Sequence, residues 1–260
     1  MSIAYLLVSH GSRDLRPYRA MQNLAVQLRE RLRLPTVSGL KSPIAQKVWT
    51  PVMEPLIGIA TLELSRKSLA KQIQAFSDRA AASRYSVVRV MPLFLLPGVH
   101  VMEDIPREVA QAQDRSRLPI QICPYLGSHP AIAQTLAEGT FTMNVTRLLL
   151  AHGSRYPGAN QPIEAIAQQL NSETAYWAIA PSLESKITAC VEQGCQTIDI
   201  LPYFLFRGST TDAIAQKVDQ LQSQFPSVTL HLSPPLGVKS TAVDLVFDLI
   251  TQPEPEPESP

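Results

Sequence analysis

The sequence repeats itself, and this repeat restricts the folds that the chain can adopt. Three segments recur in the same order, as SHGSRDLRPY and AHGSRYPGAN from residues 9 and 151, MPLFLLPGVH and LPYFLFRGST from 91 and 201, and YLGSHPAIAQ and PLGVKSTAVD from 125 and 235. Self-similarity at this distance indicates one structural unit that occurs twice. We therefore predict two like domains that arose by internal duplication, at 1–140 and 141–250.

The two copies differ in length. The first matching pair is 142 residues apart and the other two pairs are 110 residues apart, so the first copy holds about thirty extra residues. The segment 34–55 contains four prolines and is the expected insertion. Residues 251–260 alternate proline with glutamate and lack the apolar side chains that a core needs. We expect this tail to be disordered.

Within each copy, short apolar runs alternate with segments whose apolar residues recur at helical spacing. The runs at 3–8, 86–96 and 145–151 are typical of strands buried on both faces of a sheet. Steady alternation of strand and helix predicts an α/β fold, with one parallel sheet flanked by helices in each domain. We also predict a strand at 176–179.

The composition excludes several classes of protein. A net charge of +1 gives no basic surface for nucleic acid, and no apolar stretch approaches the ~20 residues of a membrane span. The three cysteines match no redox or metal motif, so we expect them to be buried in a reducing compartment. The opening residues are typical of a buried strand rather than a signal peptide. We expect a cytoplasmic monomer, in which the two domains face each other as a pseudo-dimer.

Three side chains with metal-binding chemistry follow three of the predicted strands. His10 follows the first, Glu63 lies in or just after the second, and His100 follows the third. Ligands of parallel α/β sheets bind outside the carboxyl ends of the strands, so we expect these side chains to meet. Two imidazoles and one carboxylate suit Fe(II), Co(II) or Ni(II) and leave coordination positions open. Taken singly, each residue also has a structural explanation, as a turn histidine or an outward-facing strand glutamate.

Histidine also accepts protons near neutral pH, which makes His10 and His100 candidate catalytic residues as well as metal ligands. The second copy retains only one of the three groups. His152 matches His10, but Thr210 replaces His100 and the position of Glu63 falls near Ala178. A purely structural role would be expected in both copies. We therefore predict one metal site, in the first domain.

Motifs of other enzyme classes are absent from the sequence. It contains no G-x-S-x-G of hydrolases, no G-x-x-x-x-G-K-[ST] or G-x-G-x-x-G for nucleotide phosphates, and no H-E-x-x-H of metalloproteases. The cluster of Ser9, His10 and Ser12 therefore does not indicate a hydrolase.

The segments VSHGSRD, LEL, PLFLLPGVHVMEDIP and YLGSHP together resemble the sirohydrochlorin chelatase family over nearly the whole chain. The resemblance implies two fused chelatase-like α/β domains that hold a tetrapyrrole in the cleft between them. It also implies insertion of Fe²⁺ or Co²⁺ into sirohydrochlorin, with the metal as a substrate and no prosthetic group. The family's metal ligands map onto His10, Glu63 and His100. The SRKS segment that follows Glu63 and the insertion at 34–55 depart from the family's pattern.

Sirohydrochlorin is a polycarboxylate, so the resemblance further implies cationic and N–H donors at the cleft. The expected substrate-binding residues are Ser12, Arg13 and Asp104, and Ser12 is also expected to cap the helix that follows. Arg155 and Arg207 are candidates in the second domain, although surface charge explains them equally well. Two other functions remain open: a nickel chelatase for the same substrate, and a non-catalytic carrier of tetrapyrrole or metal on the same fold.

Overall fold

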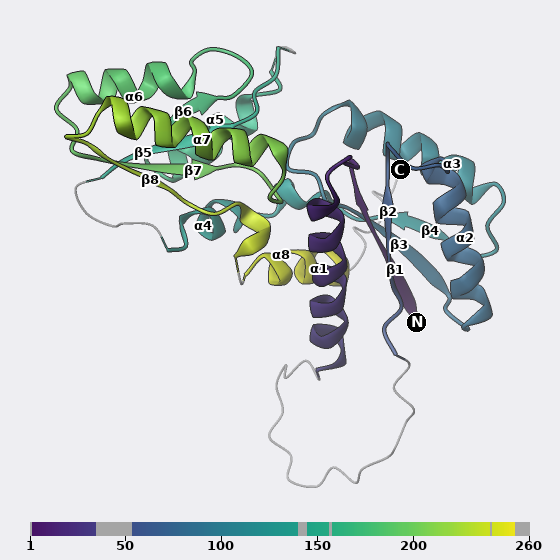
Figure 1. The fold of residues 1–260 in the computed structure, drawn as a ribbon. Helices are drawn as coiled ribbons and strands as arrows, with labels where there is room; N and C mark the ends of the chain where they lie inside the picture. The colour runs from purple at the N-terminus through teal and green to yellow at the C-terminus, as the bar shows by residue number, and fades with distance from the viewer. Residues whose placement is uncertain (1, 35–53, 140–144, 156–157, 240, 253–260) are drawn as a thin grey trace, which may run out of the picture.

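The computed structural model describes residues 2–34, 54–139, 145–155, 158–239 and 241–252. Most of the expected insertion at 34–55 and of the tail at 251–260 therefore lies outside the described residues. Strands and helices alternate through both halves of the part that is described, which confirms the predicted α/β fold (Figure 1). No helix in these ranges is both long and apolar enough to span a bilayer.

The first half forms a four-stranded parallel sheet with the order β2-β1-β3-β4. Its elements are β1 (Ile3–Ser9), α1 (Leu15–Arg33), β2 (Ile57–Thr61), α2 (Leu69–Ala82), β3 (Val87–Pro92), a π-helical turn η1 (His100–Asp104), α3 (Ile105–Gln113), β4 (Ile120–Ile122), η2 (Leu126–Ser128) and α4 (Ile132–Ala137).

The second half forms a sheet of the same kind with the order β6-β5-β7-β8. Its elements are β5 (Thr146–Ala151), α5 (Gln161–Gln169), β6 (Glu173–Tyr176), α6 (Leu183–Glu192), β7 (Thr197–Pro202), α7 (Ser209–Gln224), β8 (Thr229–Leu232), η3 (Leu236–Val238) and α8 (Ala242–Thr251). The equal strand orders confirm the duplication that the repeated segments predict.

Helices cover both faces of each sheet. α2 and α3 pack against one face of the first sheet, and α6 and α7 pack against one face of the second. The two remaining faces share a single core, in which Leu7 and Met91 of the first sheet belong to the same cluster as Leu149 and Leu201 of the second. Burial of this apolar area favours the joined arrangement of the two halves.

The last helix of each half contacts the other half. α8 packs against α1 and β3, and α4 packs against α5. Figure 1 shows α8, in yellow, beside the purple α1. The side chains of Val246 and Ile250 on α8 are fully buried in the shared core, and Arg89 of β3 donates to the carbonyl oxygens of Ile250 and Gln252. The two halves are therefore interlocked by an exchange of helices.

Further polar contacts join the halves. The Nζ of Lys239 donates to the carbonyl oxygens of Leu136 and Glu138, at 2.8 and 2.7 Å, just where α4 ends. The hydroxyl of Tyr203 donates to the carbonyl of Leu95 at 2.9 Å. Lysine at the carboxyl end of a helix pairs with carbonyls that the helix itself leaves without partners.

The strand predicted at 176–179 is wrong by its position, since β6 spans Glu173–Tyr176. After β6 the chain folds back, and the N–H of Tyr176 donates to the carbonyl of Pro181. The apolar residues at 177 and 179 are partly buried from a turn, where they pack against two different core clusters. An apolar run alone does not distinguish such a turn from a strand.

Candidate metal centre

Gly11 brings the loops after β1 and β2 into close contact. Its φ of +104° is a conformation that favours glycine, and a Cβ at this position would lie 2.3 Å from the carbonyl oxygen of Glu63. The backbone N–H of Glu63 donates to the carbonyl of His10 at 2.8 Å. The backbone therefore holds His10 and Glu63 side by side at the carboxyl edge of the first sheet.

His100 completes a set of three metal-binding side chains. The ligand atoms of His10, Glu63 and His100 all lie within 4.8 Å of one another. The Nε2 of His10 is 3.9 Å from the Oε2 of Glu63, and the two imidazole rings lie edge to face with centroids 4.8 Å apart. The side chains are 51%, 50% and 34% exposed, in that order, so the set is open to a large substrate.

The spacing of this set fits one divalent ion after a small adjustment. Two ligands that each bind an ion at about 2.1 Å lie at most about 4.2 Å apart. The widest separation in the set exceeds this by roughly half an ångström, which rotation of three partly exposed side chains can supply. The structure thus brings together the residues that the sequence singled out, while their role as metal ligands stays a prediction.

A carboxylate supports His100 from the following turn. The Nδ1 of His100 lies 2.8 Å from the Oδ2 of Asp104, and Arg107 donates to the Oδ1 of the same carboxylate. The hydrogen bond with His100, followed by that with Arg107, holds the pKa of Asp104 below its usual value. Asp104 is expected from the sequence to bind substrate, but in this structure its carboxylate is occupied by His100 and Arg107.

The other two expected substrate-binding residues, Ser12 and Arg13, lie exposed in the loop after His10. The prediction that Ser12 caps α1 is wrong. The cap is Asp14, whose carboxylate accepts the N–H of Arg16, whereas the Oγ of Ser12 accepts the N–H of Asp14. The turn after His10 takes up two more residues than the sequence analysis allowed before the helix begins.

Arg16 links this loop to the second half. Its guanidinium pairs with Asp14 at 2.5 Å and with Asp212 of α7 at 2.6 Å. These contacts hold the pKa values of both carboxyls below their usual range, in each case mainly through the hydrogen bond with Arg16. The loop that carries His10 therefore also contacts the start of α7.

Sequence reasoning missed the apolar residues around the set. The ring of Phe94 lies 6.5 Å from that of His10 and 6.2 Å from that of His100. Next to the ligand residues in the chain, Leu64, Val99 and Met102 are 60%, 54% and 63% exposed. Large apolar side chains that stay in water beside a polar cluster are typical of a binding surface. Their position directly after the strands was the signal that could have identified them.

The second half lacks an equivalent set. The N–H of Ala178 donates to the carbonyl of His152 at 2.9 Å, in the same way as Glu63 does to His10. The structure therefore places Ala178 at the position of Glu63, as the repeat predicts. Thr210 lies in the first turn of α7, where the first half has His100. Within the described residues, the second half has no comparable cluster of metal-binding side chains.

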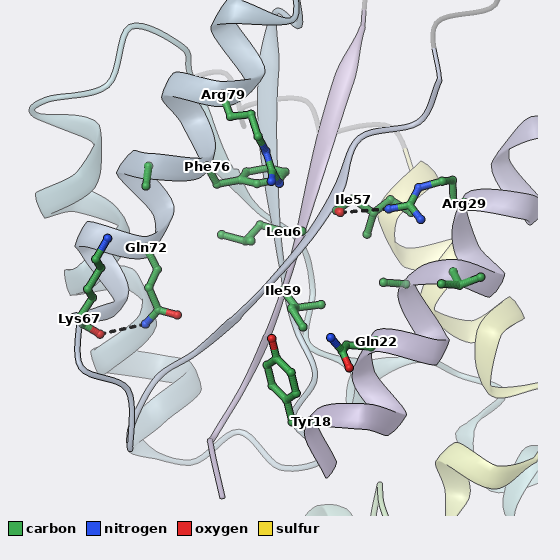
Figure 2. Close-up of a pocket in the computed structure, with 14 residues that line it drawn as sticks. Leu6, Tyr18, Gln22, Arg29, Ile57, Ile59, Lys67, Gln72, Phe76 and Arg79 are labelled. Atoms are coloured by element: carbon green, nitrogen blue, oxygen red, sulfur yellow. Dashed lines mark hydrogen bonds between the residues drawn. The ribbon is translucent and has the colours of Figure 1, made fainter. Parts of the chain in front are cut away.

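A separate groove of about 570 Å³ lies between α1 and α2, over the edge strand β2 (Figure 2). Its cationic and amide side chains already have partners. Arg29 donates to the carbonyl of Ile57, Arg79 lies over the ring of Phe76, and Gln72 bonds the backbone of Thr61. The groove thus protects the open edge of the sheet, and none of the three metal-binding side chains lines it.

Comparison with known proteins now places the chain. The family model described as CbiX matches residues 4–142 and again residues 146–252. The chain belongs to the CbiX family. The double match follows the duplication, and both matches include the sheet of one half together with its flanking helices.

Individual relatives of this CbiX-family chain are distant but extensive. A sirohydrochlorin ferrochelatase of Priestia megaterium is 25% identical over 184 residues, which cover 65% of this chain and 68% of that protein. A sirohydrochlorin cobaltochelatase of the same organism is 24% identical over 200 residues, which cover 70% of this chain and 64% of the relative. The chain thus spans about two thirds of each relative's length.

A solved structure shares the fold. The structure titled SirB from Bacillus subtilis with Fe³⁺ matches with a TM-score of 0.74 and 20% identity, covering 96% of this chain and 94% of that chain. This likeness confirms the architecture of two linked parallel sheets, including their relative arrangement over almost the whole length.

Proposed function

We propose that this protein is a sirohydrochlorin chelatase, which inserts Fe²⁺ or Co²⁺ into the tetrapyrrole. The observation that carries the proposal is the open set of His10, Glu63 and His100 at the carboxyl edge of the first sheet. The family supports this reading, as do relatives named for the iron and the cobalt reaction. The metal is a substrate here, and no prosthetic group is part of the proposal.

The metal set would hold the ion before transfer. Two imidazoles and one carboxylate suit borderline divalent ions and leave positions open for water or for the ring nitrogens of the substrate. Three protein ligands bind an ion less completely than a closed four-ligand site does. The partial exposure of all three side chains allows the ion to leave toward the tetrapyrrole.

The reaction exchanges protons for the metal. One M²⁺ enters the ring, two M–N bonds replace two pyrrole N–H bonds, and two protons leave. His10 and His100 are the proposed proton acceptors, because neutral imidazole accepts protons near pH 7. Glu63, only 3.9 Å from His10, would stabilise the imidazolium that forms.

The substrate would lie over the apolar side chains and between the two halves. The exposed Leu64, Val99 and Met102 offer apolar surface to the macrocycle, while Ser12 and Arg13 offer donors to its carboxylates. In the second half, a cavity of about 380 Å³ is lined by Arg207 and Thr211 among others. We propose Arg207 as the substrate contact of that wall.

The cytoplasmic location and the monomeric state are part of this proposal. The shared core and the exchanged helices support the monomer, because they already join two like halves within one chain. Duplicated halves of one chain can form the interface that two separate copies form in a symmetric dimer.

Absorbance under anaerobic conditions tests the function. Purified protein is mixed with sirohydrochlorin and Fe²⁺, Co²⁺ or Ni²⁺ in turn, and the spectrum of the metallated ring is followed against a protein-free control. Catalysis predicts multiple turnovers with iron or cobalt. Binding without the metallated spectrum would favour a carrier, and fastest turnover with nickel would favour the nickel chelatase.

A further inference from the structure

We propose that Asp104 is a positioning residue for His100, which fixes the imidazole tautomer that binds the metal. This inference rests on the proposed function for its purpose, but its central claim concerns the metal-free protein. It replaces the substrate-binding role that the sequence suggested for Asp104.

The backbone places the two residues on one face. His100 and Asp104 are the first and last residues of the π-helical turn η1, and the N–H of Ile105 donates to the carbonyl of His100, five residues back. A π-helical turn is wider than an α-helical one, and such single turns are frequent at functional sites. Here it sets the Nδ1 of His100 at 2.8 Å from the Oδ2 of Asp104.

This contact selects one tautomer. An ionised carboxylate only accepts hydrogen bonds, so the contact requires a proton on the Nδ1 of His100. In a neutral imidazole the Nε2 then carries the free lone pair, which is the atom available to a metal. Metal-binding histidines in general donate their other ring N–H to a carboxylate, carbonyl or water, and this fixes the orientation of the ring.

Arg107 holds Asp104 in turn. Its Nη2 donates to the Oδ1 of Asp104 at 2.5 Å from one turn further along, in α3. The two oxygens of the carboxylate thus have separate partners, and the chain Arg107–Asp104–His100 is anchored on a regular helix. Only 21% of the Asp104 side chain is exposed, less than any of the three proposed metal ligands.

The second half supplies an internal comparison. The positions 110 residues further along are occupied by Thr210, Ile214 and Lys217. Ile214 is buried in the core beneath α7, and Lys217 pairs with Glu184 instead. The fold therefore accepts an apolar residue where the first half has Asp104. A carboxylate at this position occurs together with a histidine, and not in the half that lacks one.

Nitrogen NMR of the metal-free protein tests the tautomer directly. With ¹⁵N-labelled histidine at a pH where His100 is neutral, and with H100Q to assign the signals, the wild type should show the proton on Nδ1. D104A should populate both tautomers, whereas D104E should retain the wild-type pattern in part. D114A, at the far end of α3, is the control. An unchanged tautomer in folded D104A would overturn the inference, whether or not the protein is a chelatase.

Cobalt binding measures the consequence. Titration of the tetrapyrrole-free protein with Co²⁺ should show a 10–100-fold weaker affinity for D104A, the usual loss for an outer partner of a metal ligand, and no change for D114A. Under turnover, KM for the metal should rise while KM for sirohydrochlorin stays constant. The reverse pattern would restore the substrate-binding role and overturn the inference. Wild-type protein that shows the Nδ1 tautomer but binds no Co²⁺ would count against the proposed function instead.

Discussion

Glu63 donates its backbone N–H to the carbonyl oxygen of His10, and this single bond joins two of the three proposed metal ligands. Ala178 makes the same bond to His152 in the second half. The scaffold of the site is therefore present twice, whereas its chemistry is present once. The duplication left both halves the same loop geometry, and the side chains alone distinguish the two.

Replacement of the histidines tests this asymmetry. H10A and H100A should each lower the chelation rate by at least about 100-fold, since loss of a ligand exceeds the loss from an outer partner. H152A should retain most of the activity, because Ala178 and Thr210 cannot complete a second set. Steady-state rates of the purified variants measure the effect, and circular dichroism checks that each is folded. Equal inactivation by H152A would mean that the metal is shared with, or bound in, the second half.

Glu63 should act mainly on the use of metal. E63A should raise the half-saturating metal concentration about tenfold or more, because one of three ligands is lost, and excess metal should restore part of the rate. The matched control is E192A, an exposed glutamate at the end of α6. Rates measured over a series of metal concentrations decide the outcome. A lower maximal rate with an unchanged half-saturating concentration would assign Glu63 to proton transfer.

Gly11 should be required for the geometry of the metal set. In G11A the added Cβ would clash with the carbonyl of Glu63, and in G153A with the Cγ1 of Ile179 at 2.6 Å. Both substitutions force a left-handed conformation on alanine and should cost about 1–3 kcal/mol of stability. Co²⁺ affinity should fall in G11A alone. Urea unfolding and cobalt titration together give both quantities, and an equal loss of affinity in G153A would contradict the placement of the site.

The three lowered aspartate pKa values predict a loss of stability in acid. A carboxyl whose pKa is lower in the folded state stabilises the protein above its unfolded pKa, and this contribution disappears as the pH falls through the lowered value. For Asp14, Asp104 and Asp212 the loss should therefore develop below about pH 5. R16M removes the main cause of two of these shifts, so its stability should depend less on pH in this range.

Urea midpoints between pH 7 and pH 3 measure this dependence. R115M, which replaces an exposed arginine beyond the end of α3, is the control. If R16M and wild type lose stability in parallel, the link between Arg16 and Asp212 does not persist in solution.

The exchanged helix α8 should stabilise the first half of the molecule. Ile250 is fully buried, so I250A should lower the free energy of unfolding by about 2–5 kcal/mol. V26A, on the exposed side of α1, should change it little. Hydrogen exchange locates the effect, with faster exchange expected in β3 and α1 of I250A. Faster exchange confined to the second sheet would contradict the helix exchange.

Much of the architecture could be predicted because its signals are local. The runs at 3–8 and 145–151 are continuous and apolar, as buried parallel strands are, and they match β1 and β5. The residues His10, Glu63 and His100 stand out because each follows such a strand. The run at 176–179 has the same composition but forms a turn, since its path depends on the contact between Tyr176 and Pro181. The domain boundary near residue 140 stays a prediction.

The sequence by itself determined that the chain holds two like α/β units and that only the first carries two histidines and a glutamate at its strand ends. Repeats and residue types are readable letter by letter. The tertiary structure decided that α8 packs against α1 and β3, that Asp14 rather than Ser12 caps α1, and that Asp104 contacts His100. These relationships depend on the path of the backbone and on packing between distant segments, neither of which local periodicity records.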